Sequence, residues 1–103
     1  MILVTTDKIE GKNLATLGLV TGSTVQTKNA FKDIGASFRS VVGGEAVSYT
    51  KMLSEARDQA IGRMIQQAQQ MGADAIVCVR FSSSSVMQGA AEIMACGTAV
   101  KFV

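Results

Sequence analysis

Cys78 and Cys96 are the side chains of this sequence best suited to bind a soft metal ion. Thiolates bind Cu(I) and Zn(II), and Met94 shares the predicted strand of Cys96 as a further sulfur. Zinc usually needs four ligands, the chain has no histidine, and the cysteines form no C-x-x-C motif. Both are candidate ligands for a soft transition metal ion, but a small apolar role in the core is favoured.

A second group of candidates consists of polar side chains that flank the junction between two predicted helices. Its members are Asn29, Asp33, Arg39, Tyr49 and Arg57. A polar pocket between subunits at this junction would make them ligand-binding residues. Helix capping and hydrogen bonds between the helices explain them equally well, so both interpretations stay open.

Enzymatic chemistry finds little support in the sequence. None of the eight acidic residues can pair with a histidine, and a nucleophilic cysteine would lack its usual base. The run Ser82–Ser85 is more typical of a solvated loop than of a nucleophile. Gly43-Gly44 lacks the Gly-Lys-Ser/Thr continuation of a phosphate loop. A binding or structural role is therefore favoured over an enzyme.

Composition predicts one folded domain over residues 1–103. The chain is 48% hydrophobic and only 17% charged, which is typical of a packed core. The net charge of +2 comes without a basic run, so nucleic-acid binding is not indicated. The apolar runs are shorter than the roughly 20 residues that span a membrane, and Met1–Val4 is too short for a secretory core. We expect a soluble, cytoplasmic protein with reduced cysteines.

The central element is a predicted helix over residues 46–71. Apolar side chains recur at spacings of three, four and seven and form one stripe: Leu53, Ala56, Ala60, Ile61, Met64, Ala68 and Met71. Gly72 supplies the left-handed residue that follows many helices. A strand over 74–82 follows directly.

Upstream of this helix the pattern predicts a strand, a shorter helix and an N-terminal arm. Residues 14–27 are rich in β-branched side chains, with Gly18 and Gly22 as sites of a bulge or bend. Asn29 can cap a short helix with Phe31, Ile34 and Phe38 on its apolar face, ended by Gly43-Gly44. Residues 1–6 form a possible short strand, which we expect to be an edge or exchange element.

The C-terminal third predicts a β-hairpin with a polar tip. A turn centred on Met87 would set Cys78 opposite Cys96 and place both thiols on one face. The helix-facing side would carry Val77, Val79, Phe81, Ile93 and Ala95, and the open side Ile76, Cys78, Met94, Cys96 and Val100. This register is a hypothesis, because a slip of one residue would separate the thiols.

The order of elements predicts an α+β fold. A right-handed crossover gives a three-stranded antiparallel sheet, order 1-3-2, with the helices on one face and a possible extra N-terminal strand. The opposite face would expose apolar residues beside free strand edges, a combination that monomers avoid. We therefore expect a homo-oligomer.

Several motifs, in step over nearly the whole chain, resemble the YbjQ-like family. They are Asn29, Phe31, Asp33, Arg39, Val42-Gly43-Gly44, Tyr49, Leu53, Ala56-Arg57, Ala60, Ala68, Gly72-Ala73-Asp74-Ala75 and Gly97-Thr98-Ala99-Val100. The resemblance implies a dodecin-like β-α(α)-β-β subunit, a homopentamer, and a heavy-metal-binding label with no solved function. Lys32 and Glu45 depart from the basic residues usual at their positions and lower the positive charge near the helix junction.

Three functions follow from these observations. The first is an oligomeric module that binds a metal ion or a small ligand. The second is a structural scaffold without a ligand. The third, an enzyme of unknown reaction, has the least support.

Overall fold

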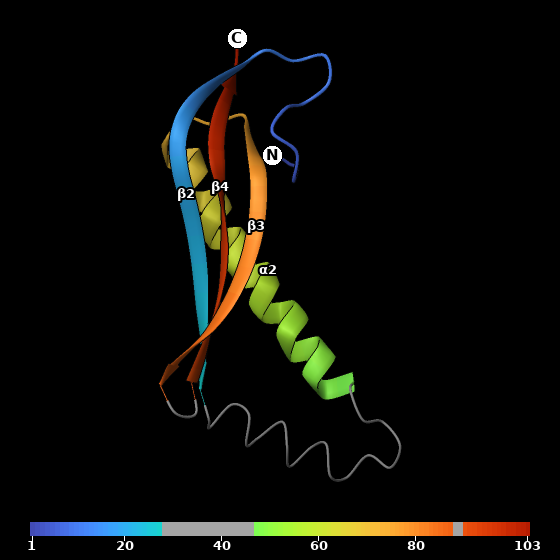
Figure 1. The fold of residues 1–103 in the computed structure, drawn as a ribbon, viewed down its shortest axis with the longest axis vertical. Coiled ribbons are helices and arrows are strands. Elements are labelled where there is room, and N and C mark those ends of the chain that lie inside the picture. The colour runs from blue at the N-terminus through green and yellow to red at the C-terminus, as the bar shows by residue number, and fades with distance from the viewer. Residues whose placement is uncertain (28–46, 88–89) are drawn as a thin grey trace.

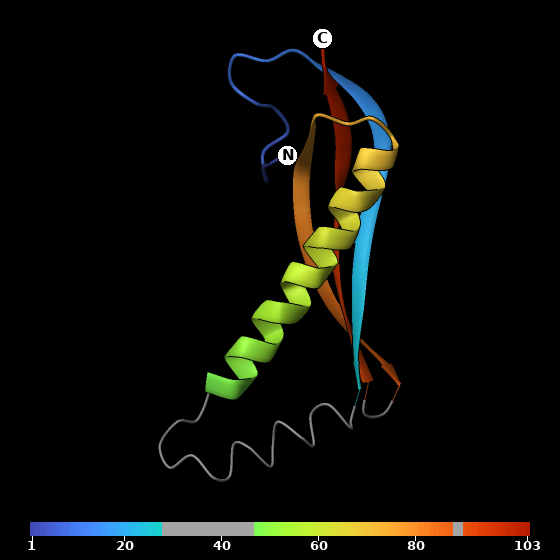
Figure 2. The same cartoon turned by 180° about the vertical axis from the view of Figure 1, so that it is seen from behind.

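The computed structural model describes residues 1–27, 47–87 and 90–103. Its strands are β1 (Ile2–Leu3), β2 (Leu14–Thr27), β3 (Ala75–Met87) and β4 (Ala90–Phe102), and its helix is α2 (Val47–Gln70). The strands form one sheet in the order β1-β3-β4-β2. Helix α2 crosses one face of this sheet diagonally, as Figures 1 and 2 show from opposite sides.

The topology confirms the order of the three long strands but not the predicted three-stranded antiparallel sheet. β4 lies between β2 and β3 and is antiparallel to both, as the sequence predicts. The sheet has a fourth strand, because β1 pairs in parallel with β3, with Ile2 beside Ala75 and Leu3 beside Ile76. The sheet is therefore mixed, and the N-terminal arm is an edge element of its own subunit. The predicted helix that starts at Asn29 lies outside the described residues.

Helix α2 confirms the predicted apolar stripe. Ala56, Ala60, Met64 and Ala68 are buried, while Leu53 at the N-terminal end of the stripe is 43% exposed. The helix ends in a Schellman motif, in which the N–H of Ala73 donates to the carbonyl of Ala68 (3.1 Å) and the N–H of Gly72 to that of Gln69 (3.0 Å). Gly72 has the positive φ of 77° that this motif requires.

The two glycines of β2 have different roles. Gly18 lies at a bulge with a φ of 149°, as predicted. Gly22 is not a bend. A Cβ at Gly22 would overlap the carbonyl oxygen of Ala60 and the backbone nitrogen of Met64, so this glycine lets the backbone of α2 lie directly on β2.

Side chains of α2 also cover the outer edge of β2. The Oε1 atom of Gln67 accepts a hydrogen bond from the N–H of Thr21 (2.7 Å), and Arg63 donates to the carbonyl of Ser23. The Thr24 hydroxyl donates to the carbonyl of Ala56 (3.1 Å). Backbone groups that would otherwise form an open sheet edge are thereby occupied.

Each face of the sheet carries its own apolar cluster. The cluster under α2 contains Val20, Met64, Ile76, Val79 and Ala95 among its buried members. The second cluster contains Ala75, Val77 and Val100, with Val4 and Ile9 of the N-terminal arm packed against it. No helix in the described ranges is both long and apolar enough to cross a membrane.

Candidate functional site

The hairpin register differs from the predicted one. Cys96 lies opposite Arg80, and Val77 lies opposite Thr98, so Cys78 and Val79 together oppose Gly97 alone. This is a β-bulge, in which one strand carries an extra residue. The prediction that Cys78 lies opposite Cys96 is wrong because Met87 pairs with Ala90, so the turn is not centred on Met87 as that register requires.

The bulge also reverses the alternation of side chains along β3. Beyond it Val79 faces α2 as predicted, but before it Ile76 is the residue that packs under α2. Val77, expected on the helix side, belongs to the opposite cluster. One extra residue turns every side chain on one side of the bulge to the opposite face of the sheet. The periodicity of the sequence alone does not show where such a bulge lies.

Cys78 is the bulged residue and has a φ of 55°. Its N–H donates to the carbonyl of Thr6 (2.9 Å), and the N–H of Val79 donates to that of Val4 (3.0 Å). The N-terminal arm therefore holds both bulge amides. Cys78 and Cys96 are free thiols as predicted, and both are only partly exposed.

The described part of the chain does not supply a zinc centre on its own. Within these residues no group of three or more His, Cys, Asp or Glu side chains could hold a metal ion. Met94 lies opposite Ser82, so its sulfur does not face a cysteine across the two strands. Because zinc usually takes four ligands, two thiols from different register positions are too few, and a role for Cys78 and Cys96 as soft-metal ligands stays a prediction.

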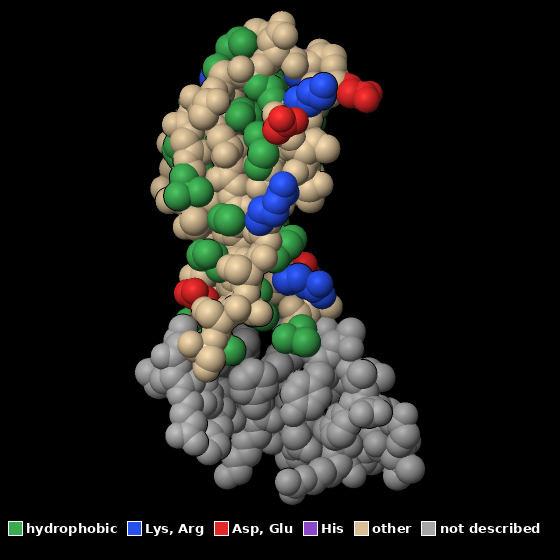
Figure 3. All heavy atoms as spheres, viewed as in Figure 1, with side chains coloured by type: hydrophobic (Ala, Val, Ile, Leu, Met, Phe, Trp, Pro, Cys, Tyr) green, Lys and Arg blue, Asp and Glu red, His purple; other side chains and the backbone are tan. Residues whose placement is uncertain are grey.

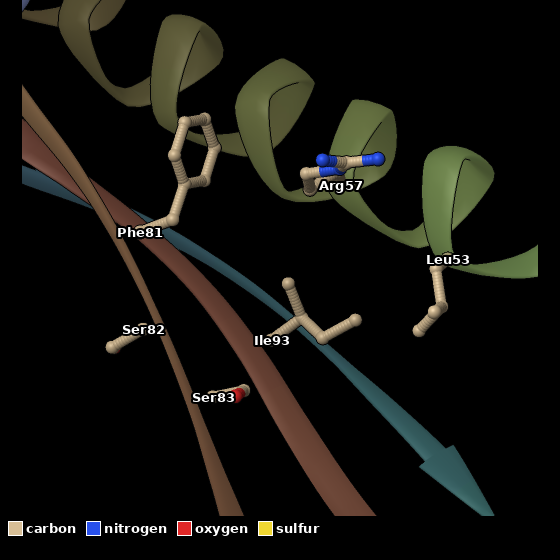
Figure 4. Close-up of a pocket in the computed structure, with 6 residues that line it drawn as sticks. All are labelled: Leu53, Arg57, Phe81, Ser82, Ser83 and Ile93. Carbon is tan, nitrogen blue, oxygen red and sulfur yellow. The ribbon is translucent and has the colours of Figure 1, made fainter. Parts of the chain in front are cut away.

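A groove of about 340 Å³ lies where α2 leaves the sheet. Figure 4 shows its lining: Leu53 and Arg57 from α2, Phe81, Ser82 and Ser83 from β3, and Ile93 from β4. The helix packs mainly on β2 and β4, and Figure 2 shows it diverging from the sheet toward its N-terminal end. Among the described residues, this part of the hairpin therefore has no helix packed on it.

The groove combines one cation with an apolar wall. Phe81 is 49% exposed, an unusual position for a large aromatic ring beside a core. Arg57 is exposed, and its Nη2 group donates a 3.4 Å hydrogen bond to the Ser54 hydroxyl. Within the described residues, the only ion pair joins Lys101 and Asp74, so no carboxylate among them pairs with Arg57. Such an arrangement can bind an anion that carries an apolar part.

The structure places two of the five predicted ligand-binding residues. Arg57 lines the groove, and Tyr49 lies in the first turn of α2. Asn29, Asp33 and Arg39 lie outside the described residues. Sequence reasoning assigned Leu53, Phe81 and Ile93 to the core, because their periodicity is that of buried positions. Ser82–Ser85, predicted as a loop, belong to β3.

In the described part of the chain, helix α2 lies on one face of a mixed four-stranded sheet with an amphipathic groove between them, which defines a small α+β protein. Residues 1–103 match the model of the YbjQ family, described as "Putative heavy-metal-binding". A UPF0145 protein of Methanosarcina acetivorans is 59% identical over 104 residues, which cover 100% of this chain and 98% of that protein. A UPF0145 protein of Clostridioides difficile is 57% identical over 101 residues, covering 97% and 90%. The chain belongs to this family of uncharacterised proteins.

A solved structure shares the fold. It is a DUF74-family protein of unknown function from Pediococcus pentosaceus, with a TM-score of 0.70 and 12% identity, covering 100% of this chain and 98% of that one. At this identity the likeness concerns the fold alone. The dodecin-like assignment stays a prediction.

Proposed function

We propose that this chain is an oligomeric binding module whose groove takes a small organic anion with an apolar part. The observation that carries the proposal is the Arg57 guanidinium, which has no carboxylate partner among the described residues, beside the exposed ring of Phe81. A volume of about 340 Å³ lies at the lower end of the range for small-molecule sites.

Each wall of the groove has a physical task in this proposal. A carboxylate or phosphate would accept charge-assisted hydrogen bonds from Arg57, whose planar group can donate two in parallel. Apolar carbons of the ligand would bury against Phe81, Leu53 and Ile93, at about 25 cal/mol per Å² removed from water. Ligand binding by Tyr49, Asn29, Asp33 and Arg39, which the sequence predicts, is part of the same proposal.

Titration with hexanoate and phenyl phosphate, followed by NMR of the ¹⁵N-labelled chain, tests this function. We expect saturable shifts at the groove residues and about tenfold weaker binding by Arg57→Gln, because a charge-assisted pair is lost. Lys51→Gln is the matched control, since Lys51 is an exposed cation on the same helix outside the groove. Equal binding by all three proteins, or no binding, contradicts the proposal.

The oligomer is the second part of the proposal, with the pentamer that the family resemblance implies and the cytoplasmic location that the sequence predicts. Apolar side chains on β2 support it, since Leu19 is 71% and Val25 52% exposed. Figure 3 shows hydrophobic side chains spread over the sheet face that turns away from α2. A scaffold without a ligand is the alternative, and absence of any bound molecule in native mass spectrometry together with a failed anion titration would favour it.

A soft metal ion is the other ligand to test, because the family label names heavy metals and both thiols are partly exposed. If Cys78 and Cys96 are the ligands, the double variant Cys78→Ser, Cys96→Ser loses the Cu(I) affinity of the natural chain. Unchanged affinity would exclude them as ligands.

A further inference from the structure

We infer that the ligand of the groove is an extended peptide segment with a free carboxyl terminus, which adds to the edge of β3 beyond the N-terminal arm and places its carboxylate at Arg57. This inference rests on the proposed function and names the class of its ligand. It depends on which backbone N–H and C=O groups at the sheet edges can still pair with another strand and on which side chains lie beside those groups.

The outer edge of β2 is already occupied. Gln67 accepts from the N–H of Thr21, and Arg63 donates to the carbonyl of Ser23. A strand that added to β2 would have to displace both side chains. Within the described residues, this leaves β3 as the edge to consider.

The first part of the β3 edge carries the N-terminal arm. The N–H of Val4 donates to the carbonyl of Ile76 (3.0 Å), and the bulge amides of Cys78 and Val79 donate to the arm. Arg80 ends this pairing, because its Nη1 group donates to the carbonyl of Thr5 (2.9 Å) and to that of Val79 (2.9 Å). The arm shows that this edge accepts a strand, and it covers the edge no further than the bulge.

The next part of the edge, Phe81–Ser84, has backbone groups that point outward. Thr21 turns its N–H away from β4, so its partner Cys96 directs its own backbone groups to Arg80 on β3. Groups along an antiparallel strand alternate, so Ser82 and Ser84 also bond to β4, while Phe81 and Ser83 present their N–H and C=O to the edge. The outward N–H of Val79 fits the same alternation.

The groove adds the side-chain part of the recognition. Phe81 and Ser83, whose backbone faces the edge, also line the groove with Arg57, so a strand added there lies beside the guanidinium. The serine side chains are small enough to let another backbone approach. Addition of a strand to an edge with pockets for its side chains is a known way of binding peptides, and a free carboxylate matches the charge of Arg57.

The test uses the full ¹⁵N-labelled chain and an acetylated tetrapeptide of alternating alanine and valine. The peptide is prepared with a free carboxyl terminus or with a terminal amide. We expect the free acid to bind at least about tenfold more tightly than the amide, and Arg57→Gln to remove that difference while Lys51→Gln keeps it. We also expect the amides of Phe81 and Ser83 to exchange with solvent at least about fivefold more slowly in the complex. The amides of Ser82 and Ser84, already bonded to β4, serve as the internal control.

The outcomes separate this inference from the proposed function. If hexanoate binds through Arg57 but the peptide gives no protection at Phe81 and Ser83, the inference is wrong and the proposed function stands. If neither ligand binds, both are wrong. Protection of the same two amides that rises with protein concentration in the absence of peptide would assign the edge to a second copy of the chain and overturn the inference. Two peptides, each methylated on one of the two alternate sets of amide nitrogens, give a second readout. Only methyl groups on the nitrogens that face β3 should abolish binding.

Discussion

At the scale of single residues, glycine positions decide how closely helix and sheet approach. Gly22 lies under α2, where a Cβ would overlap backbone atoms of Ala60 and Met64 that cannot move independently of the helix. We expect Gly22→Ala to lower the free energy of unfolding by about 2 kcal/mol, as overpacking of a dense contact does. Gly62 is the matched control, since it lies within α2 and a Cβ added there would meet no neighbouring atom within 4 Å. Gly62→Ala should raise stability by about 0.5–1 kcal/mol through helix propensity. Urea unfolding at one fixed protein concentration measures both, and an equal effect of the two variants would contradict the close contact.

Cys78 offers a second test at this scale, because its φ of 55° is costly for any residue with a side chain. Cys78→Gly should lie within about 1 kcal/mol of the natural chain, since relief of the backbone offsets the lost packing of the thiol. Cys78→Val should be less stable by about 2 kcal/mol, because a β-branched residue tolerates this conformation worst. Thermal or urea unfolding checks this order of stability between the two variants. A valine variant as stable as the glycine variant would mean that the bulge does not hold this conformation in solution.

At the scale of elements, the N-terminal arm covers the first part of the β3 edge and holds the bulge. Deleting residues 1–6 removes the acceptors of the Cys78 and Val79 amides and exposes part of the second apolar cluster. We expect faster hydrogen exchange at these two amides and a lower unfolding midpoint, with little change at Ser82 and Ser84 on β3, which bond to β4. If the deletion instead lowers the molecular mass in solution and leaves exchange unchanged, the arm pairs with a neighbouring subunit, as the sequence suggested.

At the scale of the whole molecule, assembly would cover the apolar side chains that one subunit leaves in water. Sedimentation equilibrium at micromolar concentration should give a multiple of the 10.8 kDa chain mass, five if the family resemblance holds for this chain. Leu19→Lys with Val25→Lys should shift that mass toward a single subunit, because both side chains are more than half exposed. Gln59→Lys with Gln66→Lys, at two exposed positions on α2, is the control for added charge. A natural chain that sediments at one chain mass would contradict the oligomer.

The sequence by itself determined the elements whose cause is local. The apolar spacing from Leu53 to Met71 and the glycine at position 72 placed α2 within one residue at each end, because helix period and end signals act between near neighbours. The order of the three long strands also followed from the chain, since crossovers have a preferred hand. One member of the groove, Arg57, was among the residues expected to bind a ligand.

Only the tertiary structure decided the register of β3 and the lining of the groove. The bulge at Cys78 depends on hydrogen bonds to Thr6 and Val4, about seventy residues away along the chain, and no local pattern contains them. Phe81 and Ile93 have the periodicity of core residues. They line an open groove because α2 crosses the sheet at an angle and leaves it before reaching them, and that angle comes from the close contact of α2 with Gly22 and from the packing of whole surfaces.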